Sequence, residues 1–540
     1  MVDAPREPLE QTAGARTVYS LSLLAVLLLG LVLRVHGLRS GLWLDELISG
    51  WVIADGFAEI PGRSWTANLS PLYFYILQLS TGLTGFDEPG LRLPSVLGGL
   101  ALIVLVPGWL RSLGVRPWIC VACAMLIAID PTLLEPSTWA RPTSLVIVVS
   151  LVATIAFQRI ALEGSTRARD RALFVAAHAF GFYLHYLTLV LLFWQLLFAA
   201  MLWLRDRDRR FSARRLVGDC LWTGLLCLPY AAHLAQLAGG HGTLAYTDAQ
   251  RLASELDRYL VVELLIVPLV ASWYAAFALG QPRWLREDTL RRHGPQLNLL
   301  VFLYVVPLAG FWALSKVNLV EVTVYSRYCA PLPVLALGLV LDAIDRRVPR
   351  AIGFAMACLL VASLDEAPVR SFFAEGRFSG PYQEWKQAVA QLRSDGAAGD
   401  VVFVDSGLVE QQLLGAESPA SLRDYLLVPV SGLYSLAGTG MQARPISETF
   451  VPTDAATVEA VRGAARVFVL APAEHREAAG TVSESLARAG VHLGLERVRA
   501  FEGVTVSVLT AGSDPRAGPP SPPASATRRE AAAERYRYSR

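Results

Sequence analysis

The apolar stretch Val18–Leu33, VYSLSLLAVLLLGLVL, decides the class of fold, because it is the first of many such runs along the chain. The 540-residue chain is 54% hydrophobic and only 17% charged, with a mean hydropathy of +0.42. This composition is too apolar for a soluble protein of that length and predicts an integral membrane protein. Val18–Leu33 has the character of a signal-peptide core, but no small-residue cleavage site follows it. We therefore expect it to remain as a membrane anchor.

The apolar runs predict a polytopic α-helical membrane protein with about eleven transmembrane helices, since about 20 apolar residues make one bilayer crossing. The predicted spans cover residues 18–38, 92–111, 115–133, 142–160, 172–187, 187–204, 216–235, 259–280, 297–315, 328–345 and 351–365. The run from 172 to 204 is too long for one ordinary helix, so we divide it at His185-Tyr186. An odd number of spans puts the two ends of the chain on opposite sides of the membrane.

Arginine is concentrated in alternate loops, and positively charged loops stay in the cytoplasm. A cytoplasmic N-terminus puts all of the following there: Arg111, Arg116, Arg159, Arg167, Arg169, Arg171, the block 205–215, Arg283, Arg286, Arg291, Arg292, Arg346, Arg347 and Arg350. We therefore interpret the basic block 205–215 as a topological feature and not as a nucleic-acid site. The prediction is a multi-pass protein of the cytoplasmic (inner) membrane whose C-terminal region is extracytoplasmic.

The composition becomes that of a soluble domain beyond about residue 370. Val401–Asp405 and Arg466–Leu470 predict buried strands, Glu474–Ala489 an amphipathic helix, and Val504–Leu509 an alternating strand. Together they predict a small α/β domain. The six cysteines lie in or beside apolar runs outside this region and imply no disulfide framework.

The chain is thus expected to have four parts. They are a disordered cytoplasmic N-terminus (1–17), a membrane domain (18–365) with a first outer loop at 39–91, an extracytoplasmic α/β domain (366–512), and a disordered tail rich in Pro, Ala, Ser and Arg (513–540).

The loop after the first span contains the most reactive dipeptide of the chain, Asp45-Glu46, beside Trp43. It lies within Arg34–Leu72, RVHGLRSGLWLDELISGWVIADGFAEIPGRSWTANLSPL. Two adjacent acids just past a membrane segment are poorly explained by packing, and we place the reaction centre there. The alternative is a solvated loop whose acids begin a helix.

Several ionisable groups gather on the predicted outer face, where each is costly unless it lines a wet cavity or meets a partner. They are Arg34, Asp45, Glu46, Asp130, Glu135, Arg141, His185, Tyr186, Lys316, Glu321, Arg327 and Tyr328. This mixture suits the transfer of a group from a phosphate, because a carboxylate takes the acceptor proton and cations stabilise the departing phosphate. The planar fork of arginine holds two phosphate oxygens at once.

The order of these motifs resembles that of a known family. The motifs are Leu42–Glu46, Asn68–Phe74, Leu91–Ser95, Ala140-Arg141, His185-Tyr186, and Ser326-Arg327-Tyr328 with Pro331 and Pro333 behind it. Over residues 18–365 the chain resembles the integral-membrane glycosyltransferases of the GT-C fold. The likeness is to the dolichyl-phosphate-mannose protein mannosyltransferase and aminoarabinose transferase group, or glycosyltransferase family 39.

The resemblance implies an enzyme that moves a hexose or pentose from a polyprenyl-phosphate carrier to a glycan, lipid or protein acceptor of the cell envelope, with inversion. Asp45 would then be the general base, and Glu46 would position the acceptor or the base. The substrate-binding residues would be Arg141 and Arg327, which hold the lipid phosphate, with His185, Tyr186, Tyr328, Asp130 and Lys316. No cofactor is certain, and a divalent cation at Asp45 is left open.

Two departures from the family pattern leave the sugar and the acceptor open. Thr143 replaces the expected Tyr after Arg141, and Ser70-Pro71 replaces Pro-Pro. Structural readings also compete: Glu46 can cap a helix, arginines can be interfacial residues, His185 can be a core histidine, and Asp130 can end a helix before Pro131.

Two other classes of function compete with the enzyme. The alternative is a polytopic transporter or flippase of lipid-linked sugars, which should have mid-bilayer charges and paired broken helices, whereas charge here concentrates at one face. A third possibility is a receptor whose working part is the outer domain.

Overall fold

The computed structural model describes residues 13–186, 188–205, 210–231, 287–315, 327–343, 383–475 and 477–511. The chain divides into two compact units. The helical unit consists of Met1–Gly37, Ser95–Leu228 and Ala249–Phe378, and the sheet unit of Leu38–Pro94, Pro229–Asp248 and Ser379–Arg540. The predicted first outer loop therefore belongs to the same unit as the predicted C-terminal domain.

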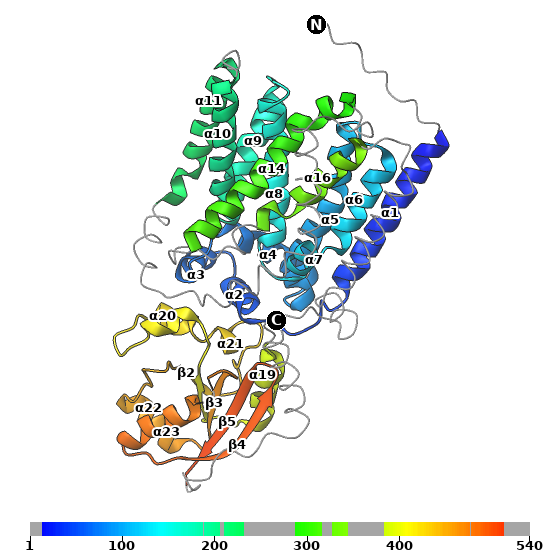
Figure 1. Cartoon of the computed structure of the whole chain (residues 1–540). Helices are drawn as coiled ribbons and strands as arrows, with labels where there is room; N and C mark the ends of the chain where they lie inside the picture. The colour runs from blue at the N-terminus through cyan, green and yellow to red at the C-terminus, as the bar shows by residue number, and fades with distance from the viewer. Residues whose placement is uncertain are drawn as a thin grey trace. The chain divides into compact units, whose positions relative to one another are not determined.

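The helical unit is a bundle of apolar helices that run side by side (Figure 1). Its described elements are α1 (Ala13–Val35), α5 (Glu88–Ser112, from Ser95 onward), α6 (Pro117–Ile129), α7 (Pro131–Leu134), η1 (Glu135–Thr138), α8 (Thr143–Ala161), α9 (Ala168–Leu184), α10 (Thr188–Arg205), α11 (Arg210–Cys227), α14 (Glu287–Ser315), η4 (Arg327–Cys329) and α16 (Pro331–Ala343). The 3-10 turn η3 (Leu228–Tyr230) crosses into the sheet unit.

Three described helices, α1, α5 and α8, are long and apolar enough to cross a membrane. A fourth crossing results if α6 and the segment Pro131–Thr138, which meet at 64°, form one broken span. Shorter apolar helices lie at Thr188–Leu204, His293–Leu308 and Pro331–Ala343. The total of eleven spans remains a prediction, and the predicted spans 259–280 and 351–365 lie outside the described residues.

The helices overlap the predicted spans but differ from them at their ends: α11 covers Arg210–Cys227 where 216–235 was predicted, and α14 covers Glu287–Ser315 where 297–315 was predicted. α1 (Ala13–Val35) includes residues before the predicted start at 18, since Ala13, Ala15 and Arg16 are favourable helix residues. The long apolar run breaks between α9 and α10, where His185 takes an extended conformation with φ −161° and ψ 116°. That break falls where the division at His185-Tyr186 was predicted.

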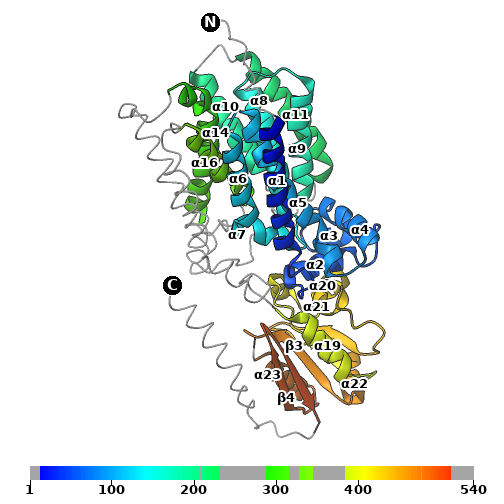
Figure 2. The same ribbon diagram turned by 90° about the vertical axis from the view of Figure 1, so that its right-hand side faces the viewer.

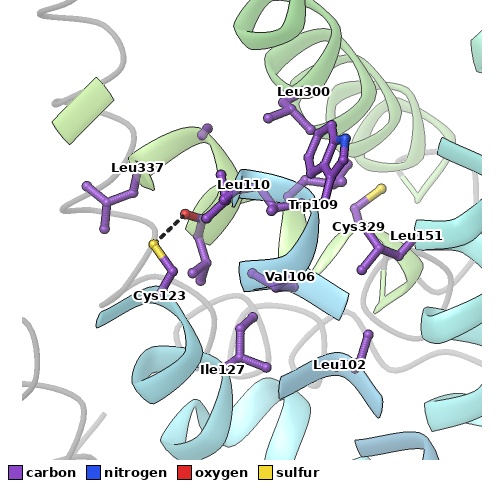
Figure 3. Close-up of a cluster of buried hydrophobic side chains, with 14 of the residues drawn as sticks. Leu102, Val106, Trp109, Leu110, Cys123, Ile127, Leu151, Leu300, Cys329 and Leu337 are labelled. Carbon is purple, nitrogen blue, oxygen red and sulfur yellow. Dashed lines mark hydrogen bonds between the residues drawn. The ribbon is translucent and has the colours of Figure 1, made fainter. Parts of the chain in front are cut away.

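The core of the helical unit is built where α5 meets α6, α8, α14 and α16 (Figure 3). Trp109 of α5 is 4% exposed and its indole N–H donates to Gln158 Oε1 at 3.1 Å. The Cys123 thiol donates to the carbonyl of Val334 at 3.7 Å, and a Cβ added at Gly338 would lie 3.1 Å from that sulfur. Small residues therefore allow α6 and α16 to approach closely.

The sheet unit contains a five-stranded mixed sheet of order β2-β1-β3-β5-β4. Its strands are β1 (Val401–Val404), β2 (Gln442–Pro445), β3 (Val467–Pro472), β4 (Gly494–Phe501) and β5 (Val504–Thr510). β1 pairs in parallel with β2 and β3, whereas β5 pairs antiparallel with β3 and β4. β1 and β3 are continuous apolar runs because both of their faces are buried.

Helices cover both faces of this sheet (Figure 1). α22 (Ala455–Gly463) and α23 (Ala478–Arg488) share one hydrophobic cluster with β1 and β3, and α19 (Trp385–Asp395) packs against β5. The remaining short elements are η5 (Val409–Leu413), α20 (Ala420–Tyr425) and α21 (Val428–Ser431).

The first outer loop forms α2 (Leu44–Ile53), α3 (Ile60–Thr66) and α4 (Leu72–Thr84). α2 packs on α21 and α3 on α20, so these short helices lie side by side (Figure 2). The Tyr434 hydroxyl accepts from Leu42 N at 2.9 Å and donates to Glu88 Oε1 at 3.1 Å, and Lys386 Nζ lies 2.7 Å from the same oxygen. The segment that carries Asp45 is thus held by the C-terminal part of the chain.

A histidine–aspartate pair makes the stability of the sheet unit depend on pH. His475 Nδ1 lies 2.9 Å from Asp405 Oδ2. This hydrogen bond raises the pKa of His475 against the opposing effect of burial, and Glu474 and Glu448 add to the rise. Because the pKa is raised in the folded state, the stabilisation is complete below about 6.5, the pKa of an unperturbed histidine, and disappears as pH rises through the folded pKa.

We therefore expect the melting temperature of the unmodified chain to fall, relative to that of His475→Gln, as pH rises above about 6.5. Thermal unfolding followed by tryptophan fluorescence at several pH values measures the difference. His492→Gln, which changes an exposed histidine of the same unit, should follow the unmodified chain. A constant difference between the unmodified chain and His475→Gln across this range would contradict the prediction.

Candidate functional site

Asp45 and Glu46 occupy the first turn of α2, which begins at Leu44 after the N-cap residue Trp43. Acidic residues at this position complement the positive end of the helix dipole. Leu47, Ile48 and Trp51 anchor the helix by burial, with at most 5% of each exposed. The two carboxylates differ sharply in environment, because Asp45 is partly exposed and Glu46 is fully buried.

Glu46 is bound by a buried arginine of the same unit, Arg92. Its Oε1 accepts from Arg92 Nε at 2.8 Å and its Oε2 from Arg92 Nη2 at 2.7 Å. The backbone N–H of Trp43 also donates to Glu46 Oε2, at 3.3 Å. The carboxylate that caps α2 is therefore also half of a bidentate ion pair, the strongest geometry for such a pair.

Arg92 also fixes the chain that leads into α2. Its Nη1 donates to the carbonyls of Leu38 and Ser40 at 2.9 and 3.0 Å, and its Nη2 to the carbonyl of Gly41 at 3.1 Å. The sequence places Arg92 in the motif Leu91–Ser95, but no role was predicted for it. Its position at the start of an apolar span could have indicated a buried ion pair, because a buried guanidinium needs an acidic partner.

A second group of predicted site residues lies in the helical unit. Arg141 is partly exposed, and its carbonyl accepts from Ser95 Oγ at 2.8 Å, which fixes the turn before α8. The Arg141 guanidinium acts electrostatically on His185, whose ring stacks on Tyr186 with centroids 5.1 Å apart. Tyr328 is 6% exposed in η4, which packs against α8. The structure thus stacks His185 on Tyr186 and places His185 within electrostatic range of Arg141.

Asp130 lies at the 64° bend between α6 and the segment that follows it. Its Oδ1 accepts from Thr132 N at 2.9 Å and from Thr132 Oγ1 at 2.8 Å, so it caps α7. The sequence left two interpretations of Asp130, a helix end before Pro131 and a substrate-binding residue. The structure shows a capping role. A part for Asp130 in substrate binding remains a prediction.

Arg34, at the end of α1, is completely buried near this bend. Its Nη1 donates to the carbonyls of Gly30 and Ala128 at 3.1 and 3.2 Å, and its charge acts on Asp130. Its Nε and Nη2 have no hydrogen-bond partner among the described residues. The donation to Ala128 supplies a partner to a carbonyl at the end of α6, because Thr132 N, four residues on, donates to Asp130 Oδ1 instead.

The guanidinium of Arg34 fits only because residue 99 is glycine. A Cβ at Gly99 would lie 2.4 Å from Arg34 Nε and 2.5 Å from Ser137 Cβ. We expect Gly99→Ala to lower the free energy of unfolding by about 1–3 kcal/mol through overpacking. Gly108→Ala is the control, because it changes the same helix where nothing lies within 4 Å of the added Cβ. Thermal unfolding in detergent compares them, and equal melting temperatures for the two variants would contradict the prediction.

The structure does not describe the side chains of two predicted substrate-binding residues. Lys316 lies outside the described residues, and Arg327 begins η4 but its side chain is not among those described. Within the described ranges, no group of three or more His, Cys, Asp or Glu residues is arranged to hold a metal ion. Asp45 and Glu46 belong to the sheet unit, and Asp130, Arg141, His185, Tyr186 and Tyr328 to the helical unit.

Comparison with known proteins identifies the fold. Residues 68–233 match the model of the dolichyl-phosphate-mannose-protein mannosyltransferase family. ArnT from Cupriavidus metallidurans in the apo state superimposes with a TM-score of 0.55 at 12% sequence identity, over 93% of this chain and 99% of that chain. The chain has the GT-C glycosyltransferase fold. The resemblance inferred from Leu42–Glu46 and the later motifs is thereby confirmed.

Two further solved structures align with most of this chain. The Archaeoglobus fulgidus oligosaccharyltransferase in the apo form gives a TM-score of 0.48 at 12% identity, over 94% of this chain and 76% of that chain. The arabinofuranosyltransferase AftD from Mycobacteria gives 0.46 at 15% identity, over 93% of this chain and 40% of that chain. No curated protein matches the sequence.

Proposed function

We propose that the protein transfers a hexose or pentose from a polyprenyl-phosphate carrier to an acceptor hydroxyl on the extracytoplasmic side of the membrane. The family match and the GT-C fold support a glycosyltransferase. The structure of ArnT is also known with undecaprenyl phosphate bound, which supports a lipid-phosphate donor. The observation that carries the proposal is the contrast between the two acids, since Arg92 engages both oxygens of Glu46 and Asp45 is partly exposed.

Asp45 acts in this proposal as the general base. Its carboxylate accepts the proton of the acceptor hydroxyl, and the hydroxyl oxygen attacks the anomeric carbon of the donor sugar from the face opposite the phosphate. The bond between that carbon and the phosphate oxygen breaks, and its electron pair leaves with the polyprenyl phosphate. The new glycosidic bond therefore has the inverted configuration. Glu46 positions Asp45, because its pairing with Arg92 fixes the first turn of α2.

Arg141 and Arg327 hold the departing phosphate in this proposal, with His185, Tyr186 and Tyr328 around them and Asp130 and Lys316 as further contacts. The electrostatic interaction between Arg141 and His185 supports a shared site for these two residues. A guanidinium stabilises the charge that develops on the phosphate as the sugar leaves.

The surroundings of Asp45 do not fit a resident divalent cation. Both oxygens of Glu46 already accept hydrogen bonds from Arg92, and the part of the chain that the structure describes has no group of three or more His, Cys, Asp or Glu residues arranged around a metal site.

The test uses the full chain in lipid nanodiscs with radiolabelled polyprenyl-phosphate mannose or polyprenyl-phosphate arabinose, one hexose and one pentose donor. The acceptor is the envelope fraction of a strain that lacks the gene. We expect label to enter that fraction while an equal amount of polyprenyl phosphate is released. In sealed vesicles, a transporter or flippase would instead move the intact donor across the membrane. Movement of the donor without release of polyprenyl phosphate would overturn the proposal.

A further inference from the structure

The sheet unit contains a cavity of about 410 Å³ at the end of β2, remote in sequence from Asp45. The elements α20, β2 and α22, all labelled in Figure 1, supply residues to its wall. Its volume lies in the range of about 300–1,000 Å³ that is common for small-molecule sites. The lining is half polar in character, with Arg423, Asp424, Arg444 and Asp454 beside Phe450 and Pro452.

The formal charges in the lining of this cavity cancel, because two arginines and two aspartates contribute to it. Such a site has no net charge with which to select an anion or a cation, but it offers both donors and acceptors. A hydroxyl group is itself both a donor and an acceptor, so the lining matches a polyhydroxylated molecule. Phe450 and Pro452 add apolar surface that suits the C–H face of a sugar ring.

Arg423 has unused hydrogen-bonding capacity. Its Nη2 donates to the carbonyl of Ala416 at 2.5 Å, whereas its buried Nε has no partner among the described residues. A buried donor without a partner destabilises its surroundings, so a small shift of the Arg423 side chain toward a ligand oxygen would be favourable. Arg444, by contrast, donates to its neighbour Gln442 Oε1 at 3.0 Å and is held at the strand end.

One wall of the cavity touches the helix that carries the proposed base. Asp424 Oδ2 accepts from the indole N–H of Trp51 at 3.1 Å, and Arg63 lies over the Trp51 ring, 4.7 Å from its centroid. Trp51 follows Asp45 by six residues on α2, about 9 Å along the helix at 1.5 Å per residue. A molecule bound in the cavity therefore lies within a short chain of sugars from Asp45.

We infer that this cavity binds the distal sugars of a glycan acceptor, whose reacting hydroxyl extends toward Asp45. The inference rests on the proposed glycosyltransferase function and specifies the acceptor as an oligosaccharide or polysaccharide. Arg423, Arg444 and Phe450 are then specificity-determining residues that do not touch the reacting atoms.

The test measures transfer by the full chain at increasing concentrations of the glycan fraction released from the envelope of the deletion strain. We expect Arg444→Gln and Phe450→Ser each to raise the KM for this glycan about tenfold, since a charged hydrogen bond or a stacked ring contributes about that factor. The kcat and the KM for the lipid donor should not change. Arg393→Gln, which changes an exposed arginine on α19 outside the cavity, is the matched control and should leave all three constants unchanged.

The experiment distinguishes failure of the glycan-binding cavity from failure of the proposed glycosyltransferase function. If the unmodified chain transfers no sugar, the proposed function fails. If it transfers sugar to the glycan but the two variants keep the unmodified KM, the cavity is not an acceptor site. A fall in kcat at constant KM would assign the cavity a structural role, and label found only in protein or lipid would exclude a glycan acceptor. Both of these results would also overturn the inference.

Discussion

Asp45→Asn is expected to lower kcat for sugar transfer by about 10²–10⁴-fold, the usual contribution of a general base. Asparagine keeps the size of the side chain and its place in the first turn of α2, but its amide cannot accept the hydroxyl proton. Binding of the lipid donor should persist, because the proposed phosphate-binding residues lie elsewhere in the chain. Single-turnover transfer from a radiolabelled donor, together with donor binding by the same preparation, measures both quantities.

Glu59→Gln provides the control for this experiment. It neutralises an exposed acid of the same outer loop whose side chain makes no cap hydrogen bond to α3. We expect its kcat to match that of the unmodified chain. Transfer by Asp45→Asn at the unmodified rate would show that another group takes the proton.

Arg92→Gln is expected to lower the free energy of unfolding by about 3–5 kcal/mol, because it leaves the Glu46 carboxylate buried without its partner. Both side chains are at most 3% exposed, so water cannot replace the lost interaction without opening the structure. The start of α2 and the carbonyls of residues 38–41 lose their donors at the same time. Denaturant unfolding in mild detergent, followed by tryptophan fluorescence, measures the change.

Two variants test the cause of this loss. The double variant Glu46→Gln with Arg92→Gln removes both charges, so it should be more stable than Arg92→Gln alone. Arg497→Gln breaks a more exposed pair with Asp395 in the same unit and should change stability by at most about 1 kcal/mol. A loss for Arg92→Gln no larger than that for Arg497→Gln would mean that the buried pair does not hold α2.

Much of the secondary structure could be predicted from hydrophobic patterning. The predicted strands at 401–405, 466–470 and 504–509 coincide with β1, β3 and β5, because these strands are apolar runs buried in the sheet. β2 was missed, since Gln442–Pro445 is a short edge strand that contains an arginine and a proline. β4 was missed as well, because Glu496, Arg497 and Arg499 interrupt its apolar residues.

The candidate site shows a different limit of prediction. The acid pair could be recognised from its position after the first span. The different environments of Asp45 and Glu46 could not be predicted, because Arg92 lies 46 residues from Glu46 in the sequence and contacts it only in the folded chain. The cavity beside Trp51 could not be predicted either, because Trp51 and its partner Asp424 are 373 residues apart in the sequence. Asp130 was ambiguous for a local reason, since an acid before proline serves equally well as a cap or a ligand.

The contacts between the first outer loop and the C-terminal part also bear on biosynthesis. The partner of Leu42, Tyr434, is synthesised 392 residues later, and the partner of Trp51, Asp424, 373 residues later. At about 5–20 residues per second of translation, the loop emerges about 20–80 s before its partners exist. The pair of Glu46 with Arg92 can form early, but the contacts of α2 with the C-terminal part form only after residue 434 is made. We therefore expect products that terminate before that residue to be inactive.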